Sequence, residues 1–411
     1  MKTSGWCLYA LCVCSVAIAA CSQTTGFSRF QFTPNVNGVP DRGAGPPSYR
    51  VLHSFGSTHD GDYPNAGLIY AGDAFYGTTY GGGRGTHDCG RGYGGCGTVF
   101  SITISGAEKV LHSFGRTKTD GRQPYGGLVN VRGTFYGTTG YGGAFDHGTV
   151  FSITPDGKEK VLHSFGRGTD GYDPSSVLLD VGGTLYGTTS AGGTNFCASS
   201  DGCGTVFSIT TSGKERALHN FGKGHDGRFP DAGLIDVHGT LYGTTYKGGA
   251  YAQGIVFSIT PDGKEKVLHS FGGVTGANPA SELIDVKGRL YGTTPYGGTH
   301  NSSGTLFSVT INGKERVLHN FGKGTDGSGP YRSLIDVGGT LYGATIHGGA
   351  YGLGTLFSIT TGGAEKVLHD FRRRTDGSSP LGDLAYKGGS FFGATAYGGS
   401  YGDGVVFSLT P

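Results

Sequence analysis

Apolar and polar positions alternate along most of the chain, in a pattern that returns about every fifty residues. Each copy contains four short runs of this kind, of the types GLIDV, TLYGTT, GTVFSIT and EKVLHSF. A period of two over such short runs is typical of strands, and none of the runs has the 3.6-residue period of a helix. The pattern therefore predicts four strands in each copy and an all-β chain.

The length of the repeat indicates the architecture. A histidine recurs in the fourth strand of every copy at intervals of 50 to 59 residues: His53, His112, His163, His219, His269, His319 and His369. Repeats of this length are typical of propeller blades and solenoid turns. A sheet that is apolar on both sides needs a neighbour on each side, and a closed ring supplies two neighbours to every copy.

The two ends of the repeated region complement each other. It begins with a lone fourth strand, residues 49–55, and it stops after a third strand, residues 404–411. Together these strands complete a seventh copy, whereas neither end offers the polar capping repeat that an open solenoid needs. We therefore predict a seven-bladed β-propeller of four-stranded antiparallel blades over residues 49–411, closed by pairing of the N-terminal strand with the last blade.

The connections between strands are of two kinds. Tight turns such as Gly182-Gly183 and Asp156-Gly157 join the first strand to the second and the third to the fourth. The other connections, such as residues 141–148 and 322–330, are longer, polar and variable. In an antiparallel meander the short turns share one edge and the long loops share the other. We call the side with the long loops the loop face.

Composition narrows the possible partners. Glycine supplies 83 of the 411 residues, and these glycines alternate with apolar residues, which argues against a disordered chain. The formal net charge is +2 and only 15% of the residues are charged, so there is no basic field that would attract nucleic acid. We expect a monomer without a nucleic-acid partner.

The N-terminal region differs from the repeats. Lys2 precedes an apolar stretch from Trp6 to Ala20, which has the length of a signal-peptide core and is short for a membrane span. The run ending at Cys21 resembles the lipobox of bacterial lipoproteins. This resemblance implies cleavage before Cys21, attachment of lipid to it and, because Ser22 follows, passage to the outer membrane. An ordinary signal peptide cut after Ala20 is the alternative.

We accordingly expect three parts: a lipoprotein signal peptide (1–20), a flexible tether (21–48) and the propeller (49–411). The tether contains Pro, Gly, Ser and Asn without apolar periodicity. The chain would be exported and anchored in the bacterial cell envelope, and it would touch the membrane only through its lipid.

The composite VLHSFG, TDG, GLI, LYGTT, GG, GTVFSIT and GKEK covers residues 51–411 and resembles the GloVer tandem repeats of bacterial surface proteins, whose members carry different anchors. The resemblance implies an exported or surface location and brings no established catalytic residues. In the fifth copy residues 274–278 replace the Thr-Asp-Gly run, and Ala344 and Ala394 replace a threonine in the last two copies. These departures argue against a ligand that needs seven identical loops.

The repeated histidines and aspartates have structural interpretations. Seven histidines spread around a rim cannot converge on one ion, so we expect each to be buried on the same side as the Val and Phe of VLHSF and bonded to backbone. The aspartates of the TDG run are expected to cap backbone amides: Asp60, Asp120, Asp170, Asp226, Asp326 and Asp376. Calcium bound with Asp62 or Asp173 is the alternative, although no EF-hand spacing is present. We expect no metal and no cofactor.

Four cysteines lie in pairs inside enlarged loops between second and third strands. Cys89 is near Cys96, and Cys197 is near Cys203. Nearby pairs in an exported protein indicate two local disulfides. A four-cysteine zinc site is the alternative, but the pairs belong to blades that are not adjacent.

If repetition marks the scaffold, function should lie where the copies differ. Aromatic and cationic residues flank the paired glycines of the long loops: Tyr141, Lys247, Tyr296, His347, Tyr397, Tyr251, Tyr351 and Tyr401. Exposed rings on glycine-rich loops can stack on sugars or anchor a protein partner, so we predict a non-catalytic binding or display surface. Packing of loop against loop is the alternative role for these rings.

An enzyme, a carbohydrate-active lyase or hydrolase, is the alternative function. Catalysis normally needs a unique and asymmetric set of residues. The departures from the repeat offer Glu282 and the scattered His147, His300 and His347, in which no catalytic pair is recognisable.

Overall fold

The computed structural model describes residues 47–56, 59–85, 89, 94–197, 202–372 and 376–411. The expected signal peptide, the lipidation site Cys21 and nearly all of the expected tether lie outside these ranges. Within them, no helix has the length and apolar character needed to cross a membrane.

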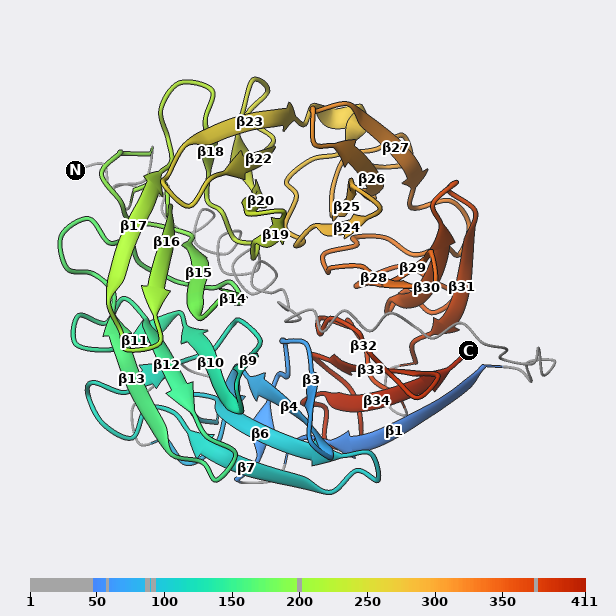
Figure 1. The fold of residues 1–411 in the computed structure, drawn as a ribbon. Helices are drawn as coiled ribbons and strands as arrows, with labels where there is room; N and C mark the ends of the chain where they lie inside the picture. Colours follow the sequence, from blue (N-terminus) through green and yellow to red (C-terminus); the bar gives the residue numbers. More distant parts are fainter. Residues whose placement is uncertain (1–46, 57–58, 86–88, 90–93, 198–201, 373–375) are drawn as a thin grey trace, which may run out of the picture.

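In the described part of the chain, seven four-stranded antiparallel sheets surround a central axis (Figure 1). Blade 1 contains β3 (Ile69–Ala71), β4 (Ala74–Thr79), β6 (Thr98–Thr103) and β7 (Glu108–Ser113). Blade 2 contains β9 (Val129–Val131), β10 (Thr134–Thr139), β12 (Thr149–Ile153) and β13 (Glu159–Ser164). Blade 3 contains β14 (Leu179–Val181), β15 (Thr184–Thr189), β16 (Thr205–Thr210) and β17 (Glu215–Asn220).

The remaining blades repeat this order. Blade 4 contains β19 (Ile235–Val237), β20 (Thr240–Thr245), β22 (Ile255–Ile259) and β23 (Glu265–Ser270). Blade 5 contains β24 (Ile284–Val286), β25 (Arg289–Thr294), β26 (Thr305–Thr310) and β27 (Glu315–Asn320). Blade 6 contains β28 (Ile335–Val337), β29 (Thr340–Thr345), β30 (Thr355–Thr360) and β31 (Glu365–Asp370). Blade 7 contains β32 (Ala385–Lys387), β33 (Ser390–Thr395), β34 (Val405–Thr410) and, from the other end of the chain, β1 (Ser48–Ser54).

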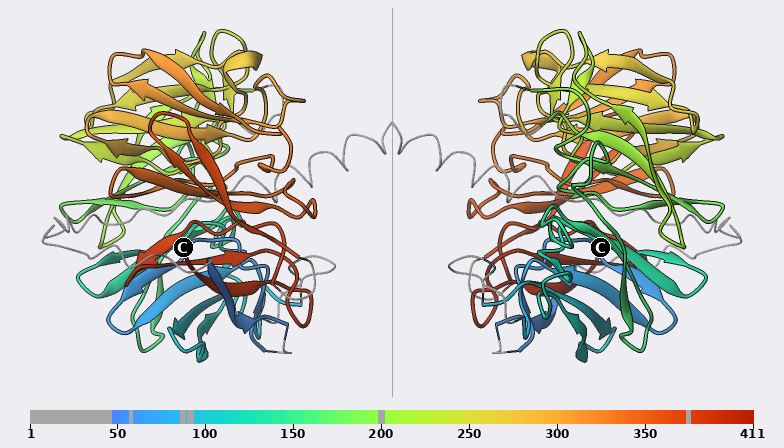
Figure 2. Two further views of the ribbon diagram at one scale, coloured as in Figure 1. Left: turned by 90° about the vertical axis from the view of Figure 1, so that its right-hand side faces the viewer. Right: turned by 90° about the vertical axis from the view of Figure 1, so that its left-hand side faces the viewer.

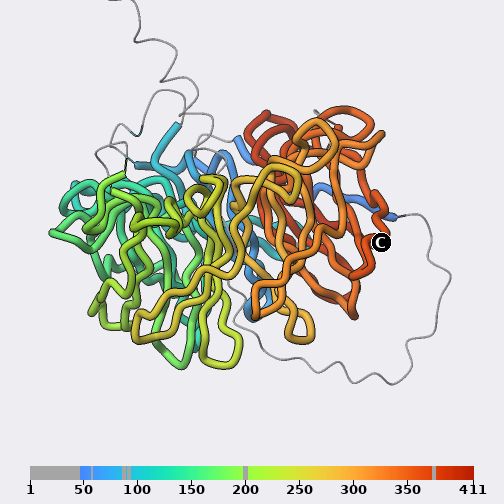
Figure 3. Tube along the Cα trace, turned by 90° about the horizontal axis from the view of Figure 1, so that it is seen from above, coloured from blue at the N-terminus to red at the C-terminus, as the bar shows by residue number. Residues whose placement is uncertain are grey.

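The ring is closed as predicted. Strand β1 lies beside β34 (Figure 1), and the two pair antiparallel from Ser48 opposite Thr410 to Ser54 opposite Val405. Side views show the twisted blades fanned around the ring, with the connections at its two faces (Figures 2 and 3). The prediction of a closed seven-bladed propeller is confirmed.

The core consists of apolar clusters between neighbouring blades. The Phe of each VLHSF segment packs against the Phe of the third strand in the next blade; Phe55 and Phe100, for example, have ring centroids 5.2 Å apart. The glycine of the YGTT strand makes room for this ring, because a Cβ on Gly137 would lie 2.6 Å from the ring of Phe151. Each blade therefore buries both faces against its neighbours, which explains why one copy cannot fold alone.

A β-bulge in every fourth strand changes which side each residue faces. In β7, His112 pairs with Val99 and Val110 pairs with Phe100, so Leu111 between them has no partner opposite. In β23, consequently, Val267 packs in the cluster between blades 3 and 4, whereas Leu268 packs between blades 4 and 5. The prediction that the histidine shares a side with this Val is wrong, because the bulge lies between them.

Threonines of the second strands link neighbouring blades near the axis. Their hydroxyls donate to a carbonyl of the next blade, as Thr78 does to Gly126 at 3.1 Å and Thr138 does to Ser176 at 2.9 Å. Ala344 and Ala394 occupy this position in blades 6 and 7 and have no hydroxyl to donate. The two threonine replacements thus remove a hydrogen bond between blades.

Candidate functional site

On the loop face, short ladders fasten the long loops to each other. The pairs are β2 (Gly61–Asp62) with β5 (Gly81–Gly82), β8 (Gly121–Arg122) with β11 (Tyr141–Gly142), and β18 (Gly227–Arg228) with β21 (Lys247–Gly248). Single bridges join Tyr296, His347 and Tyr397 to the equivalent segments. The following glycine is required because it has a positive φ, +83° at Gly142, and because a Cβ there would lie 2.3 Å from the Asp120 carbonyl.

All eight candidate binding residues are exposed. The exposed fraction is 66% for Tyr251 and Tyr401 and 53% for Tyr351, and Tyr141, Tyr296, Tyr397, Lys247 and His347 are also classed as exposed. Among the described residues, eight of the twelve exposed large apolar side chains lie in the loops between second and third strands. Some rings also pack between loops, since Tyr397 contacts Tyr63 with centroids 5.2 Å apart.

The loops are fastened to the rim in two ways. Tyr251 lies over Gly272, just after a fourth strand, and Tyr351 lies 4.8 Å from the Arg372 guanidinium. In blades 1 and 3 buried cysteines occupy the corresponding place, and the predicted disulfides Cys89–Cys96 and Cys197–Cys203 are present. Cα atoms of these pairs are 5.2 and 5.4 Å apart. Blades 1 and 3 therefore have a disulfide-bonded cysteine at the place where blades 4, 6 and 7 have a tyrosine.

Within the described ranges, no hydrogen bond from a repeated histidine to backbone is present, so the predicted partner is wrong there. In six copies the histidine Nε2 instead faces the TDG aspartate, at 3.3 Å for His53–Asp60, 3.5 Å for His112–Asp120, 3.0 Å for His163–Asp170 and His219–Asp226, and 2.9 Å for His319–Asp326 and His369–Asp376. The other carboxylate oxygen accepts a backbone amide, such as Gly322 N at 2.9 Å. The predicted capping role of the aspartate is confirmed, and sequence reasoning missed its second role.

We call the place where a fourth-strand histidine faces the next blade an interblade joint and number it by the two blades. The next blade contributes a glutamate to every joint except the one that closes the ring. The bulge turns Glu at the start of the fourth strand toward the preceding blade and His at its end toward the following one. The Oε1 atoms of these glutamates are buried without a hydrogen-bond partner: Glu108, Glu159, Glu215, Glu265, Glu315 and Glu365. Burial raises the pKa of each of these carboxyls to about 7.

The joint that closes the ring, joint 6/7, has Tyr49 where the others have glutamate. Its ring stacks on His369 with centroids 4.0 Å apart, and its hydroxyl donates to the Asp376 carbonyl. Burial, together with the charge of Asp376, raises the pKa of Tyr49. The closing strand thus joins the ring with an aromatic contact in place of a carboxylate.

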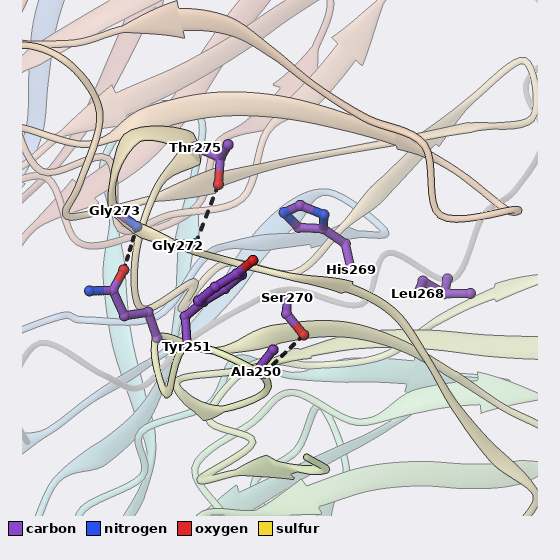
Figure 4. A pocket seen from close by; sticks show the side chains of 9 residues that line it. Ala250, Tyr251, Leu268, His269, Ser270, Gly272, Gly273 and Thr275 are labelled. Atoms are coloured by element: carbon purple, nitrogen blue, oxygen red, sulfur yellow. Dashed lines mark hydrogen bonds between the residues drawn. The ribbon is translucent and has the colours of Figure 1, made fainter.

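Joint 4/5 lacks the aspartate. Its loop is one residue shorter, and Thr275 stands at the position that Asp occupies before the glycine in the other copies. The Thr275 hydroxyl accepts a hydrogen bond from the Gly272 amide at 3.4 Å. His269 Nε2 has no hydrogen-bond partner, and burial lowers the pKa of His269. An open hollow of about 900 Å³ lies here, with Tyr251, Gln253 and Ser270 in its lining (Figure 4).

Charged residues that break the repeat gather before the inner strands. Glu282, Arg332 and Asp383 are 4%, 2% and 2% exposed, at positions that are small or apolar in most copies. Ser333 connects them, because its amide donates to Asp383 Oδ1 at 2.8 Å and its hydroxyl accepts the Glu282 amide at 3.1 Å. Glu282 was the only one of the three among the candidates from the sequence, although Arg332 and Asp383 depart from the repeat in the same way when the copies are aligned.

The remaining histidine candidates are dispersed. His147 lies in a loop of blade 2, where its ring is 4.7 Å from that of Tyr172. His300 lines a second hollow, of about 430 Å³, beside His319 and Glu365 at joint 5/6. The structure does not bring these histidines into one group with His347 of blade 6.

Comparisons with known proteins identify the repeat. The family model described as the Gloeobacter/Verrucomicrobia repeat matches residues 42–200, 85–303, 194–345 and 297–411. None of the curated proteins matches the chain.

Several solved structures are similar at low identity. They include a candidate 6-phosphogluconolactonase from Bacteroides uniformis (15% identity, 79% of this chain and 90% of that one, TM-score 0.49) and a gluconolactonase from Xanthomonas campestris (14%, 64% and 78%, 0.40). A puromycin hydrolase is 13% identical over 82% of this chain and 50% of its own, with a TM-score of 0.49. Similarity at this level carries no argument about activity.

Proposed function

Because the chain belongs to the Gloeobacter/Verrucomicrobia repeat family and repeats one scaffold seven times, we propose that it is a non-catalytic binding module whose loop face holds a glycan. The supporting observation is the gathering of exposed aromatic side chains on the loops between second and third strands. An apolar ring costs free energy when it faces water, and the faces of sugar rings can cover it.

The surroundings of Tyr251 suit a sugar best. Its ring is 66% exposed and borders the hollow of joint 4/5, where Gln253, His269, Ser270 and Thr275 supply donors and acceptors for hydroxyl groups. A concave site with one aromatic wall and a few convergent polar groups is a typical small-ligand site. Tyr351 and Tyr401 occupy related positions in blades 6 and 7 and would extend the surface along a longer chain.

The proposed location is the bacterial cell envelope, with a lipid on Cys21 as the anchor. The lipobox resemblance supports this proposal. One acyl chain binds a membrane only reversibly, whereas two or more chains on Cys21 would anchor the protein stably. Metabolic labelling with a fatty-acid analogue should mark the wild-type protein and leave Cys21→Ser unlabelled. Labelling of that variant would contradict the anchor.

A glycan array probed with residues 21–411 tests the binding function, with a peptide array in parallel. We expect Tyr251→Ala and Tyr351→Ala each to weaken glycan binding about fivefold, because one stacked ring contributes about 1 kcal/mol. Tyr386→Ala is the matched control, since that exposed tyrosine lies in β32 beside a short turn. Glycan binding that survives both loop-face changes, or binding to peptides alone, would refute the proposal.

A hydrolase or lyase is the second candidate, favoured by two buried acidic residues: Ser333 bonds to the backbone amide of Glu282 and to the carboxylate of Asp383. If Glu282 and Asp383 act on a bound polysaccharide, incubation should release shorter products and Glu282→Gln should stop that release. Glycan binding without any product supports the module instead.

A further inference from the structure

Joint 1/2 differs from every other joint in its hydrogen bonding. A potential metal-ligand atom of each of His112, Asp120 and Glu159 lies within 4.8 Å of the other two. His112 Nε2, Asp120 Oδ1 and Glu159 Oε1 are buried without a hydrogen-bond partner, and His112 Nε2 is 3.5 Å from Asp120 Oδ1. Asp120 is only 6% exposed. Side chains from two blades therefore bring unsatisfied metal-ligand atoms close together in one buried place.

One extra residue in the loop explains this arrangement. Asp120 follows His112 by eight residues, because Lys118 is inserted, whereas Asp170 follows His163 by seven. The distance from His112 Nε2 to Asp120 Oδ1 is 3.5 Å, against 2.9 to 3.3 Å in the other paired joints. The other oxygen, Oδ2, accepts the Arg116 amide at 3.0 Å and holds the carboxylate in this place.

We propose that joint 1/2 is a zinc site, in which His112, Asp120 and Glu159 bind one Zn²⁺ and fasten blade 1 to blade 2. A buried polar atom without a partner destabilises the folded chain, and one cation satisfies all three atoms. Two carboxylates also supply the charge that balances a divalent ion.

The donor set fits zinc better than calcium. An imidazole nitrogen with two carboxylate oxygens is a typical first-row transition-metal set, and the fourth position stays open to water. Calcium takes six to eight oxygen ligands, which this joint does not offer. Atoms spaced up to 4.8 Å apart surround a point about 2.8 Å from each, so shifts below about 1 Å give the zinc bond lengths of about 2.0–2.2 Å.

The proton on Glu159 competes with the metal. Zinc binds the ionised carboxylate of Glu159 and the neutral imidazole of His112, so the zinc affinity should fall as the pH is lowered.

Other joints supply internal controls. His163, Asp170 and Glu215 are grouped within the same 4.8 Å, but His163 and Asp170 are already within hydrogen-bond distance at 3.0 Å. A metal there must replace that hydrogen bond, and binding should be weaker. Joint 4/5 has His269 and Glu315 but no aspartate, so it should not hold zinc tightly.

The test is titration of the tag-free, thiol-blocked chain with ZnCl₂ after removal of metal by EDTA. Calorimetry should show one tight site, and Co²⁺ should give the visible absorption of a four-coordinate ion. His112→Gln and Glu159→Gln should each weaken this site more than about 100-fold, which exceeds the loss of a second-sphere partner. His269→Gln should leave it unchanged.

Deletion of Lys118 sharpens the test. It restores the regular spacing without removing a donor atom, and it should weaken zinc binding at least about tenfold. Unfolding scans in EDTA verify that each variant folds; Asp120→Asn replaces any that does not.

Absence of a tight zinc site, wild-type affinity in Glu159→Gln, or an equal loss in His269→Gln would overturn the proposal. Glycan binding by the loop face provides a separate readout, so the two proposals can fail independently.

Discussion

Joints 1/2 and 4/5 are built from the same repeat but have loops of different length. The loop of joint 1/2 is one residue longer than the regular loop, and the loop of joint 4/5 is one residue shorter. The longer loop of joint 1/2 keeps the aspartate but moves it out of hydrogen-bond distance of His112. The shorter loop of joint 4/5 loses the aspartate, leaves His269 without a partner and borders an open hollow. The same scaffold thus yields a cluster of buried polar side chains at one joint and an open hollow at another.

This difference shows where a repeat protein can vary at low cost. The strands, the bulge and the core phenylalanines are the same at both joints, because each blade needs them to cover its neighbour. The loops carry little of that core. A change of one residue there alters the chemistry of a joint and leaves the ring intact.

Both joints exist only in a closed ring, so the largest effect is expected from opening the ring. Deletion of residues 48–55 removes β1 from joints 6/7 and 7/1 and exposes the edge of β34. We expect loss of cooperative unfolding and aggregation, measured by urea denaturation and size-exclusion chromatography. Deletion of residues 1–47 is the control and should leave the fold unchanged. Cooperative unfolding of the 48–55 deletion would show that β1 is dispensable.

The second-largest effect is expected at joint 6/7, which closes the ring. Tyr49→Ala removes a ring stacked on His369 and Phe407 and should cost about 3 kcal/mol. Tyr49→Phe keeps the ring and should cost about 1 kcal/mol, the value of the hydroxyl hydrogen bond. Urea denaturation measures both. Equal losses would show that the hydroxyl, and not the stacked ring, holds the closing joint.

Thr275→Asp should make joint 4/5 resemble its neighbours. A carboxylate facing His269 favours the imidazolium and should reverse the lowered pKa of His269, which histidine NMR titration can follow. Because the folded-state pKa then rises, the gain, about 1 kcal/mol, is present at low pH and lost as pH rises through that pKa. Thr275→Asn, with no charge, is the control. An unchanged His269 titration would show that the shorter loop cannot place the carboxylate.

The smallest expected effect concerns the glutamates shared by both joints. The pKa of Glu159 and of Glu315 is raised to about 7, so their stabilising contribution is complete below the unfolded value and is lost as pH rises to 7. Glu315→Gln should flatten this pH dependence by on the order of 1 kcal/mol, after solvent screening. Thermal unfolding from pH 4 to pH 8 measures it. Saturating zinc should remove the pH dependence of stability that is due to Glu159. It should not change the pH dependence that is due to Glu315.

Much of the molecule could be predicted from particular residues. The orphan strand at 49–55 and the missing fourth strand after 411 indicated the ring closure, and the paired cysteines indicated both disulfides. The histidine partners could not be predicted, because the side that His112 faces depends on a bulge at Leu111 that has no local signal. The cluster of Glu282, Arg332 and Asp383 depends on contacts between blades about fifty residues apart.

The sequence by itself determined the blade, the number of copies and the way the ends meet, because alternation and turn residues act within one copy and its ends must complete a sheet. Only the tertiary structure decided what each joint contains. A joint takes its histidine and aspartate from one blade and its glutamate from the next. The distances among these groups depend on the twist of the ring and the length of one loop, and no single copy specifies both.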